Sequence, residues 1–304
     1  MALAKTLVCV VGPTAVGKTA AGIQLAQHFQ TVVVSADSRQ FYREMTIGTA
    51  KPSAEELAAV PHHFIHSHHI TDDYSAGDFE RDALALLAEL FVRHDVVVLV
   101  GGSGLFVQAV CRGLDELPKP LPGVRDRLNT LYREQGLKAI QALLQQVDPD
   151  YFNEMDSQNP QRVIRALEVF ESTGKPFSHF RRGHAAARPF EVLTLGLDMP
   201  REQLYERINA RVEAMMAAGL LDEVQGLLPH RERPPLQTVG YAELFDYLDG
   251  KYTLEAAVDR IKQHTRRYAK RQLTWFRKDK TTAWFAPDDI GAMTAYVSSV
   301  LNLR

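Results

Sequence analysis

The sequence predicts an α/β fold in which helices cover both faces of a parallel sheet. Short apolar runs alternate along the chain with amphipathic segments of helical period. In addition, the first apolar run passes through a glycine loop directly into a helical pattern. Ligands of such sheets bind at the carboxyl ends of the strands, so we expect the functional residues there.

The predicted elements follow one another in a regular order. The apolar run at residues 7–11 is followed by GPTAVGKT and then by AAGIQLAQHF, whose apolar residues recur at helical spacing. Two further apolar runs, at 31–36 and 96–100, flank an amphipathic helix, FERDALALLAELFVRH. The glycine loop, Asp37 and the turn at 101–104 should therefore lie along one edge of the sheet.

A helical insertion interrupts this pattern. From residue 114 the segment LDELPKPLPG is rich in proline, and no strand pattern returns until FEVLTLGLDM near residue 190. We therefore expect an α/β core formed by residues 1–113 and 190–304, with a mostly helical domain at 114–189. The core should end with a basic helix, a short strand at 282–286 and a terminal helix.

The composition is that of an ordinary globular protein, with 45% hydrophobic and 24% charged residues. Cys9 and Cys111 lie in apolar runs, which argues against a disulfide framework or cysteine-ligated zinc. The first apolar run is too short for a signal peptide, and no run approaches the roughly 18 residues of a membrane span. We expect a cytoplasmic monomer without a membrane partner.

The segment at residues 12–19 matches the phosphate-binding pattern G-x-x-x-x-G-K-[ST] and stands between a strand and a helix. Backbone N–H groups, the helix N-terminus and the Lys18 ammonium all favour phosphate oxygens, and the Thr19 hydroxyl is a ligand for Mg²⁺. The core is therefore predicted to be P-loop NTPase-like. The expected polyphosphate-binding residues are Gly12, Pro13, Thr14, Ala15, Val16, Gly17, Lys18 and Thr19.

The acid that usually orients magnesium and water in a nucleoside-triphosphate hydrolase is missing from the best candidate strand. The strand at 96–100 ends in Gly101 and Gly102, and Asp37 is the carboxylate well placed on the edge of the sheet. Asp37 is a magnesium ligand, a general base or a turn former with Ser38. A phosphate loop beside one carboxylate favours transfer of a group to or from a diphosphate over a motor or a switch.

Charge is unevenly distributed, although the formal net charge is only -2. Residues 260–280 contain nine Lys or Arg and one acidic residue, a local charge of +8 that leaves -10 for the rest of the chain. Further basic residues occur at 162–165 and 181–184. Two basic surfaces favour a long polyanion such as RNA, although the lid arginines of a small-molecule kinase would give the same pattern. Arg211 alone indicates either a phosphate clamp or a surface arginine.

The histidine-rich run at residues 61–69, PHHFIHSHH, leaves two alternatives open. As a strand it would place His62, His66 and His68 on one face, as transition-metal ligands. The run lacks a carboxylate or cysteine at a metal-motif spacing, which favours a loop-and-strand segment that flanks the site.

Six segments in order resemble the tRNA dimethylallyltransferase family, also called the tRNA isopentenyltransferases. They extend through most of the chain: GPTAVGKT, DSRQFY continuing to IGTAKPS, GGSGLF, NPQRVIRALE, VGY and RYAKRQLTWF. The third segment usually reads GGTGLY in the family. Ser103 therefore keeps the hydroxyl, whereas Phe106 lacks the phenol oxygen.

The resemblance implies that the loop binds dimethylallyl diphosphate together with Mg²⁺, and that the acceptor is the exocyclic amine of the adenosine 3′ of a tRNA anticodon. It implies that Asp37 is the base on that amine, that Thr19 positions diphosphate and Mg²⁺, and that Arg211 joins Lys18 on the leaving diphosphate. The helical insertion would contact the anticodon arm. The implied tRNA-binding residues are Asp37, Ser38, Arg39, Gln40, Ser103, Arg125, Gln161, Arg162, Val163, Ile164 and Arg165, to which the basic helix adds Arg266, Lys270 and Arg271.

Two other functions compete with this interpretation. A P-loop kinase acting on a nucleoside or another small metabolite would use residues 114–189 as its lid. A non-catalytic nucleotide switch or RNA-binding module would respond to nucleotide without forming a product. The missing acid at the end of the strand at 96–100 argues against both.

Overall fold

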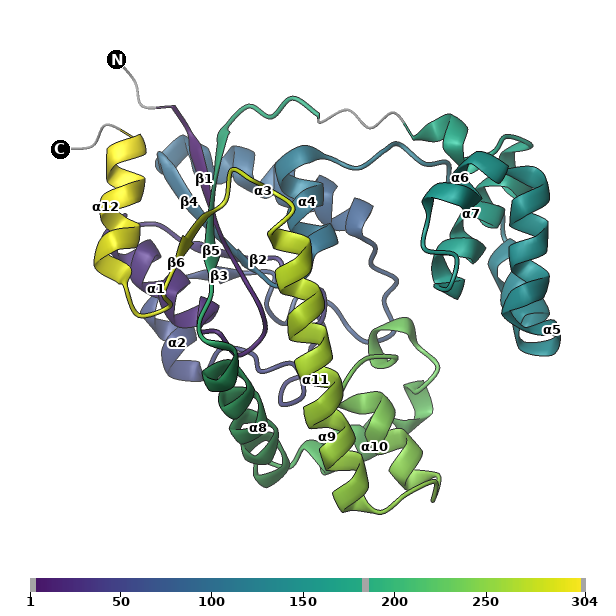
Figure 1. Ribbon diagram of the computed structural model, residues 1–304. Helices are drawn as coiled ribbons and strands as arrows, with labels where there is room; N and C mark the ends of the chain where they lie inside the picture. The colour runs from purple at the N-terminus through teal and green to yellow at the C-terminus, as the bar shows by residue number, and fades with distance from the viewer. Residues whose placement is uncertain (1–3, 182–185, 302–304) are drawn as a thin grey trace. The chain divides into compact units, whose positions relative to one another are not determined.

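The computed structural model describes residues 4–181 and 186–301, and the chain forms two compact units (Figure 1). The α/β unit contains Met1–Arg112 and Ala187–Arg304, and the helical unit is Gly113–Ala186. Most of the basic stretch noted at 181–184 lies outside the described residues.

The sheet of the α/β unit is parallel throughout, with the strand order β3-β2-β4-β1-β5-β6. This confirms the predicted α/β class. The strands are β1 (Thr6–Val11), β2 (Val33–Ser35), β3 (His62–His63), β4 (Val96–Gly101), β5 (Glu191–Leu197) and β6 (Ala283–Phe285).

β1 lies between β4 and β5, and all of its side chains are buried. Its alternate residues point to opposite faces of the sheet, so Leu7 and Cys9 join one apolar cluster, and Val8 and Val10 join another. This central position explains why its sequence is a continuous apolar run. It also places the glycine loop in the middle of the carboxyl edge of the sheet.

Helices cover both faces of the sheet (Figure 1). Apolar residues of α3 and α4 pack in the cluster with Leu7, whereas those of α1 and α12 pack in the cluster with Val8. The helices of this unit are α1 (Lys18–His28), α2 (Ala54–Ala59), α3 (Ala76–Arg93), α4 (Gly104–Arg112), α8 (Arg201–Ala217), α9 (Leu220–Gly226), α10 (Tyr241–Leu248), α11 (Leu254–Phe276) and α12 (Ile290–Val300), with short 3₁₀ turns at Leu228–His230 and Pro234–Leu236.

α3 begins before the helix that apolar spacing predicts. The Ser75 hydroxyl accepts a hydrogen bond from the Asp78 N–H (3.2 Å), and the Asp78 carboxylate accepts one from the Ser75 N–H (3.1 Å). This reciprocal cap satisfies two backbone donors that would otherwise lack partners, so the helix extends to Ala76.

The helical unit contains α5 (Val124–Val147), α6 (Pro149–Glu154), α7 (Pro160–Thr173) and a 3₁₀ turn at Phe177–Phe180. α5 and α7 pack against each other through an apolar core of their own that includes Leu128, Ile140, Leu144 and Leu167. A separate core is what a folded insertion requires.

The histidine-rich run is mostly loop. Only His62–His63 forms a strand, and the positive φ values of Phe64 (61°) and His66 (54°) turn the chain away from extended geometry. The longer strand that would place His62, His66 and His68 on one face is therefore not formed, and the run has the loop-and-strand structure that was favoured. The described residues contain no group of three or more His, Cys, Asp or Glu that could hold a metal ion, which argues against the transition-metal alternative.

No helix in the described ranges is both long and apolar enough to cross a lipid bilayer.

Candidate functional site

A cavity of about 320 Å³ lies at the carboxyl ends of β1, β2 and β4. Its wall combines the glycine loop after β1, Asp37 after β2 and the turn after β4, together with cationic side chains from α8. The residues that line it are Thr14, Ala15, Gly17, Lys18, Thr19, Ala20, Asp37, Gln40, Thr49, Ala50, Lys51, Glu56, Val100, Gly101, Gly102, Arg207 and Arg211.

The glycine loop depends on two glycine conformations. Gly12 has φ +147°, and a Cβ there would lie 2.7 Å from the carbonyl oxygen of Leu197. Gly17 has φ +111° and immediately precedes α1. Both conformations are strained for residues with a side chain, so the glycines let the loop curl tightly and aim the N-terminus of α1 at the cavity.

Lys18 is held at the cavity wall by its own loop. Its Nζ donates a hydrogen bond to the carbonyl oxygen of Pro13 (2.8 Å), which leaves two N–H donors of the ammonium for a ligand. Burial lowers the pKa of Lys18 to about 8, and Arg211 acts in the same direction while Asp37 opposes both. An anion placed in the cavity would favour the protonated ammonium.

α8 contributes two arginines where sequence reasoning had singled out only Arg211. Arg207 and Arg211 are one helical turn apart, so both reach the cavity. Burial lowers the pKa of Arg211, and the neighbouring Arg207 guanidinium lowers it further. The spacing of four residues in QLYERINARVEAM was the signal that could have revealed Arg207.

Asp37 combines the turn-forming role with a place in the cavity. Its Oδ1 accepts a hydrogen bond from the Arg39 N–H (3.0 Å), and the side chain also lines the cavity. The neighbouring Ser38 joins the turn after β4, because its N–H donates to the Ser103 hydroxyl (3.1 Å) and the two hydroxyls are 3.0 Å apart. Tyr268 of α11 borders the same group. Although its ring is partly exposed, reduced hydration of its hydroxyl raises its pKa to about 12, Asp37 adds to this effect, and a hydrogen bond with Ser103 opposes it.

The loop at residues 46–51 contributes Thr49, Ala50 and Lys51 to the cavity wall, and Glu223 of α9 fixes this loop. The Glu223 carboxylate accepts hydrogen bonds from the N–H groups of Thr46, Ile47 and Gly48 (2.7–3.0 Å) and from the Tyr241 hydroxyl (2.6 Å). A Cβ on Gly48 would lie 2.6 Å from the Tyr241 ring, so only glycine allows this packing. Nothing in the sequence pattern indicated Glu223.

Gln40 holds the same loop from the other side. Its Nε2 donates to the carbonyl oxygens of Thr49 and Ala50 (both 3.2 Å), and its Oε1 lies 3.3 Å from the Ser35 hydroxyl. The side chain expected to contact tRNA is therefore largely engaged within the protein.

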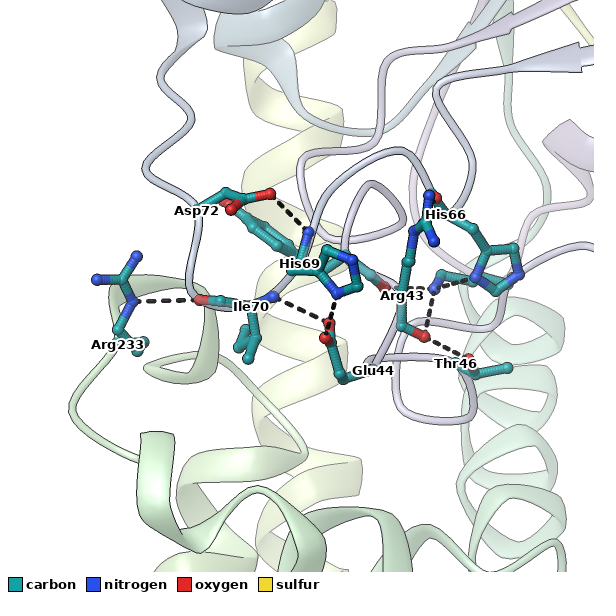
Figure 2. Close-up of polar contacts among 10 residues, drawn as sticks. Arg43, Glu44, Thr46, His66, His69, Ile70, Asp72 and Arg233 are labelled. Carbon is teal, nitrogen blue, oxygen red and sulfur yellow. Dashed lines mark hydrogen bonds and ion pairs between the residues drawn. The ribbon is translucent and has the colours of Figure 1, made fainter.

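Lys51 connects this loop to the histidine-rich segment. Its Nζ donates to the carbonyl oxygen of Tyr42 (2.5 Å) and lies 3.0 Å from His66 Nδ1, and burial lowers the pKa of Lys51 to about 8. Further along the segment, the Glu44 carboxylate binds His69 Nδ1 (2.9 Å) and accepts from the Ile70 N–H (2.9 Å) (Figure 2). The histidine-rich run thus flanks the cavity and supports its wall.

α11 displays some of its basic residues to solvent and directs others to α8. Arg267, Lys270 and Arg271 are exposed. Lys262 Nζ pairs with Glu213 (2.9 Å), and Arg266 Nη1 donates to Asn209 Oδ1 (2.6 Å). The predicted tRNA contact of Arg266 therefore competes with a partner on α8.

The helical unit gathers its basic residues around a buried carboxylate. Glu168 is fully buried and lies 3.4 Å from Arg125 Nη1 and 3.3 Å from Arg165 Nη1. Gln161 Oε1 accepts from Arg125 Nη2 (3.1 Å), and Arg162 is exposed. Val163 and Ile164 are fully buried in the core of this unit, so their side chains do not face RNA, which revises the expectation for these two positions.

The oxygen atoms around Thr19 fit a magnesium ion. Mg²⁺ prefers oxygen ligands and is usually bound by one or two carboxylates, waters and substrate phosphates. The Thr19 hydroxyl and the carboxylates of Asp37 and Glu56 all line the cavity. This donor set is small, so phosphate oxygens would have to supply part of the coordination.

These features define a P-loop protein whose cavity combines cationic side chains with the carboxylates of Asp37 and Glu56, and whose strand β4 ends in glycine rather than in the acid of a hydrolase. The chain belongs to the IPP transferase family, whose family model matches residues 40–279.

Named relatives agree with this assignment. The chain is 50% identical over 297 residues to the tRNA dimethylallyltransferase of Christiangramia forsetii, covering 97% of this chain and 98% of that protein. It is 46% identical to tRNA dimethylallyltransferase 1 of Bacteroides thetaiotaomicron over 96% of this chain and 95% of that protein.

Solved structures give the same result. The tRNA isopentenylpyrophosphate transferase of Bacillus halodurans has a TM-score of 0.72 and 38% identity, with 98% of this chain and 97% of that chain covered. A eukaryotic dimethylallyltransferase acting on tRNA has a TM-score of 0.80 and 25% identity, with 99% and 80% covered. The predicted family, fold and prenyltransferase activity are confirmed, and prenyl transfer is favoured over the kinase alternative.

Proposed function

We propose that this protein transfers the dimethylallyl group of dimethylallyl diphosphate to the exocyclic amine of the adenosine 3′ of the anticodon in tRNA. The observation that carries the proposal is one cavity in which Asp37 faces the diphosphate-binding set of Lys18, Thr19, Arg207 and Arg211. Nearly full-length similarity to tRNA dimethylallyltransferases supports it.

The cations of the cavity act on the leaving group. A bond forms between the adenine nitrogen and the allylic C1 carbon, while the bond between C1 and the diphosphate oxygen breaks and leaves its electron pair on that oxygen. Negative charge therefore grows on the diphosphate, where Lys18, Arg207, Arg211 and the N-terminus of α1 converge. Such pre-positioned charge is commonly the largest electrostatic contribution to catalysis.

Asp37 acts on the acceptor. An exocyclic adenine amine is a weak nucleophile, so the attack requires a proton acceptor as the new bond forms. The Asp37 carboxylate takes that proton, and its hydrogen bond with the Arg39 N–H fixes the direction in which it points. The target base must leave its stack to reach the cavity, which is easiest in a single-stranded anticodon loop.

Thr19, with Glu56, would hold magnesium in this cavity. The bound ion would neutralise charge on the departing diphosphate.

The exposed basic residues provide the contacts to tRNA. We assign this role to Lys270 and Arg271 on α11 and to Arg162 in the helical unit. We add the half-buried Arg39 and Ser103, which adjoin the cavity residues Gln40 and Gly102 in the chain. Backbone phosphates would neutralise these cations. We further propose that the enzyme acts as a monomer in the cytoplasm.

One experiment separates the candidate functions. The protein is incubated with unmodified tRNA, a mixture of nucleosides, Mg²⁺ and either dimethylallyl diphosphate labelled in the prenyl group or ATP labelled in the γ-phosphate. We expect only the prenyl label to appear in the RNA. Consumption of ATP with a labelled small-molecule product would instead identify a kinase, and the absence of any product would identify a binding module.

A further inference from the structure

A single side chain, Gln272, joins α11 to two walls of the cavity. Its Oε1 accepts a hydrogen bond from the Thr14 N–H in the glycine loop (2.8 Å), and its Nε2 donates one to the Gly102 carbonyl oxygen after β4 (2.8 Å). Thr14 and Gly102 line the cavity, whereas Gln272 lies behind them and is 6% exposed.

The two partners explain why this position holds glutamine. A carboxamide presents an acceptor and donors in one plane, and this orientation is the one in which both backbone groups are satisfied. An ionised glutamate would turn an acceptor toward the Gly102 carbonyl oxygen. An apolar side chain would leave a backbone N–H and a backbone C=O without their partner at a buried place, which is costly.

The packing around Gly102 makes the arrangement sensitive to small shifts. A Cβ on Gly102 would lie 2.5 Å from Gln272 Nε2 and 3.4 Å from Lys18 Nζ. The same turn packs against α11 again at Gly104, where a Cβ would lie 2.3 Å from Trp275 Nε1. Gly102 therefore lies close to both Gln272 and Lys18, so a displacement of the turn would change the surroundings of the ammonium that is placed to bind the diphosphate.

We propose that Gln272 is a positioning residue that holds the glycine loop and the turn after β4 at the separation that diphosphate binding requires. The inference rests on the proposed function. It assigns to Gln272, a residue of the basic helix, a role in binding the prenyl donor, dimethylallyl diphosphate, rather than in binding tRNA. Its neighbours Lys270 and Arg271 are exposed, so the same helix serves tRNA with its outer face and the donor site with its inner face.

The test uses the full-length protein with Gln272→Met, which keeps side-chain length but removes both hydrogen bonds. The matched control is Thr274→Ala, an exposed residue of the same helix. Equilibrium binding of dimethylallyl diphosphate should weaken about tenfold in Gln272→Met. Binding of tRNA should stay close to that of the unaltered protein, and the control should leave both affinities unchanged.

The Gln272→Glu variant adds a measurement, the pH dependence of donor affinity, that would not change if Gln272 had only a structural role. Protonated glutamic acid can donate to Gly102 while accepting from Thr14, whereas the carboxylate cannot donate. We therefore expect the ratio of this variant's donor affinity to that of the unaltered protein, both measured at the same pH, to rise as pH falls. This variant also keeps the proposal testable if Gln272→Met fails to fold.

The inference would be overturned by unaltered donor affinity in Gln272→Met, or by a Gln272→Glu ratio that is constant with pH. Parallel loss of donor and tRNA binding with a lowered melting temperature would also overturn it, because that pattern indicates general packing. Failure of the unaltered protein itself to bind dimethylallyl diphosphate would instead refute the proposed function on which the inference rests.

Discussion

The two cationic surfaces of the α/β unit hold their charges in different ways. Lys18 and Arg211 line an enclosed cavity, where burial lowers the pKa of each, whereas Lys270 and Arg271 on α11 are exposed. Enclosed cations recognise a compact anion by geometry, and exposed cations attract an extended anion with release of its counterions. Donor affinity should therefore respond mainly to pH, and tRNA affinity mainly to salt.

The largest effect is expected at Asp37, which lines the cavity. Asp37→Ala removes the proton acceptor, so single-turnover prenyl transfer should fall by about 10²–10⁴-fold. Binding of tRNA should remain nearly intact, as measured by filter retention. A variant that transfers the prenyl group at the original rate would exclude Asp37 as the base.

Loss of an enclosed arginine should have the next largest effect. Arg207→Gln or Arg211→Gln removes a charge that stabilises the departing diphosphate, so kcat/KM for dimethylallyl diphosphate should fall by about 10²-fold. Arg201→Gln is the matched control, because Arg201 lies on the same helix and stacks over Tyr205, with its guanidinium carbon 5.0 Å from the ring centroid. An equal loss in all three variants would show that the effect belongs to α8 as a whole.

The enclosed lysine should make donor binding dependent on pH. Because the pKa of Lys18 is about 8, the ammonium loses its proton as pH rises through that value, and affinity for dimethylallyl diphosphate should decline there. Titration calorimetry between about pH 7 and pH 9 measures this decline. Affinity that is constant over this interval would contradict the assignment of Lys18 to the diphosphate.

The same pKa predicts that the stability of the protein changes with pH in the direction opposite to that of donor affinity. Between about 8 and its usual value of 10.5, Lys18 binds fewer protons in the folded protein than in the unfolded chain, so its contribution to the free energy of unfolding rises with pH. Lys18→Met should remove this contribution, which denaturant titrations at several pH values would detect. Lys51→Met tests the neighbouring lysine, whose pKa is also about 8.

The smallest effect of a single residue on function is expected for the exposed cations of α11. Replacing Lys270 and Arg271 with alanine should weaken tRNA binding and lower the slope of log affinity against log salt by about 0.7–0.9 for each lost phosphate contact. Replacing Lys262 and Arg266 is the matched control, since these cations already contact Glu213 and Asn209. Equal slopes for the two double variants would show that exposure does not decide which cations meet the RNA.

The parts of the fold that depend on local pattern could be predicted from the sequence. The strand, glycine loop and helix at residues 6–28 follow from an apolar run, two glycines and helical spacing, all of which act over a few residues. The strand order could not be read in this way. β1 lies between β4 and β5 because each buries its apolar faces there, and those partners are about 90 and 185 positions away in the chain.

The candidate site likewise contains residues that could be predicted from the sequence and residues that could not. Lys18, Thr19 and Asp37 belong to recognisable segments at strand ends, and they line the cavity as expected. Glu223 and Gln272 were missed as supports of the cavity wall. An isolated acidic or amide residue in a helix has no distinctive spacing, and their roles depend on backbone groups contributed by distant loops.

Charge shows the same distinction within one helix. The sequence by itself determined that residues 260–280 are strongly basic, and with its motifs it determined the family, the phosphate loop and the carboxylate beside it. Only the tertiary structure decided which of these cations are exposed, because α8 runs beside α11 and engages Lys262 and Arg266. Residue type and local spacing specify what a side chain is able to bind, whereas the packing of distant elements specifies which partner it meets.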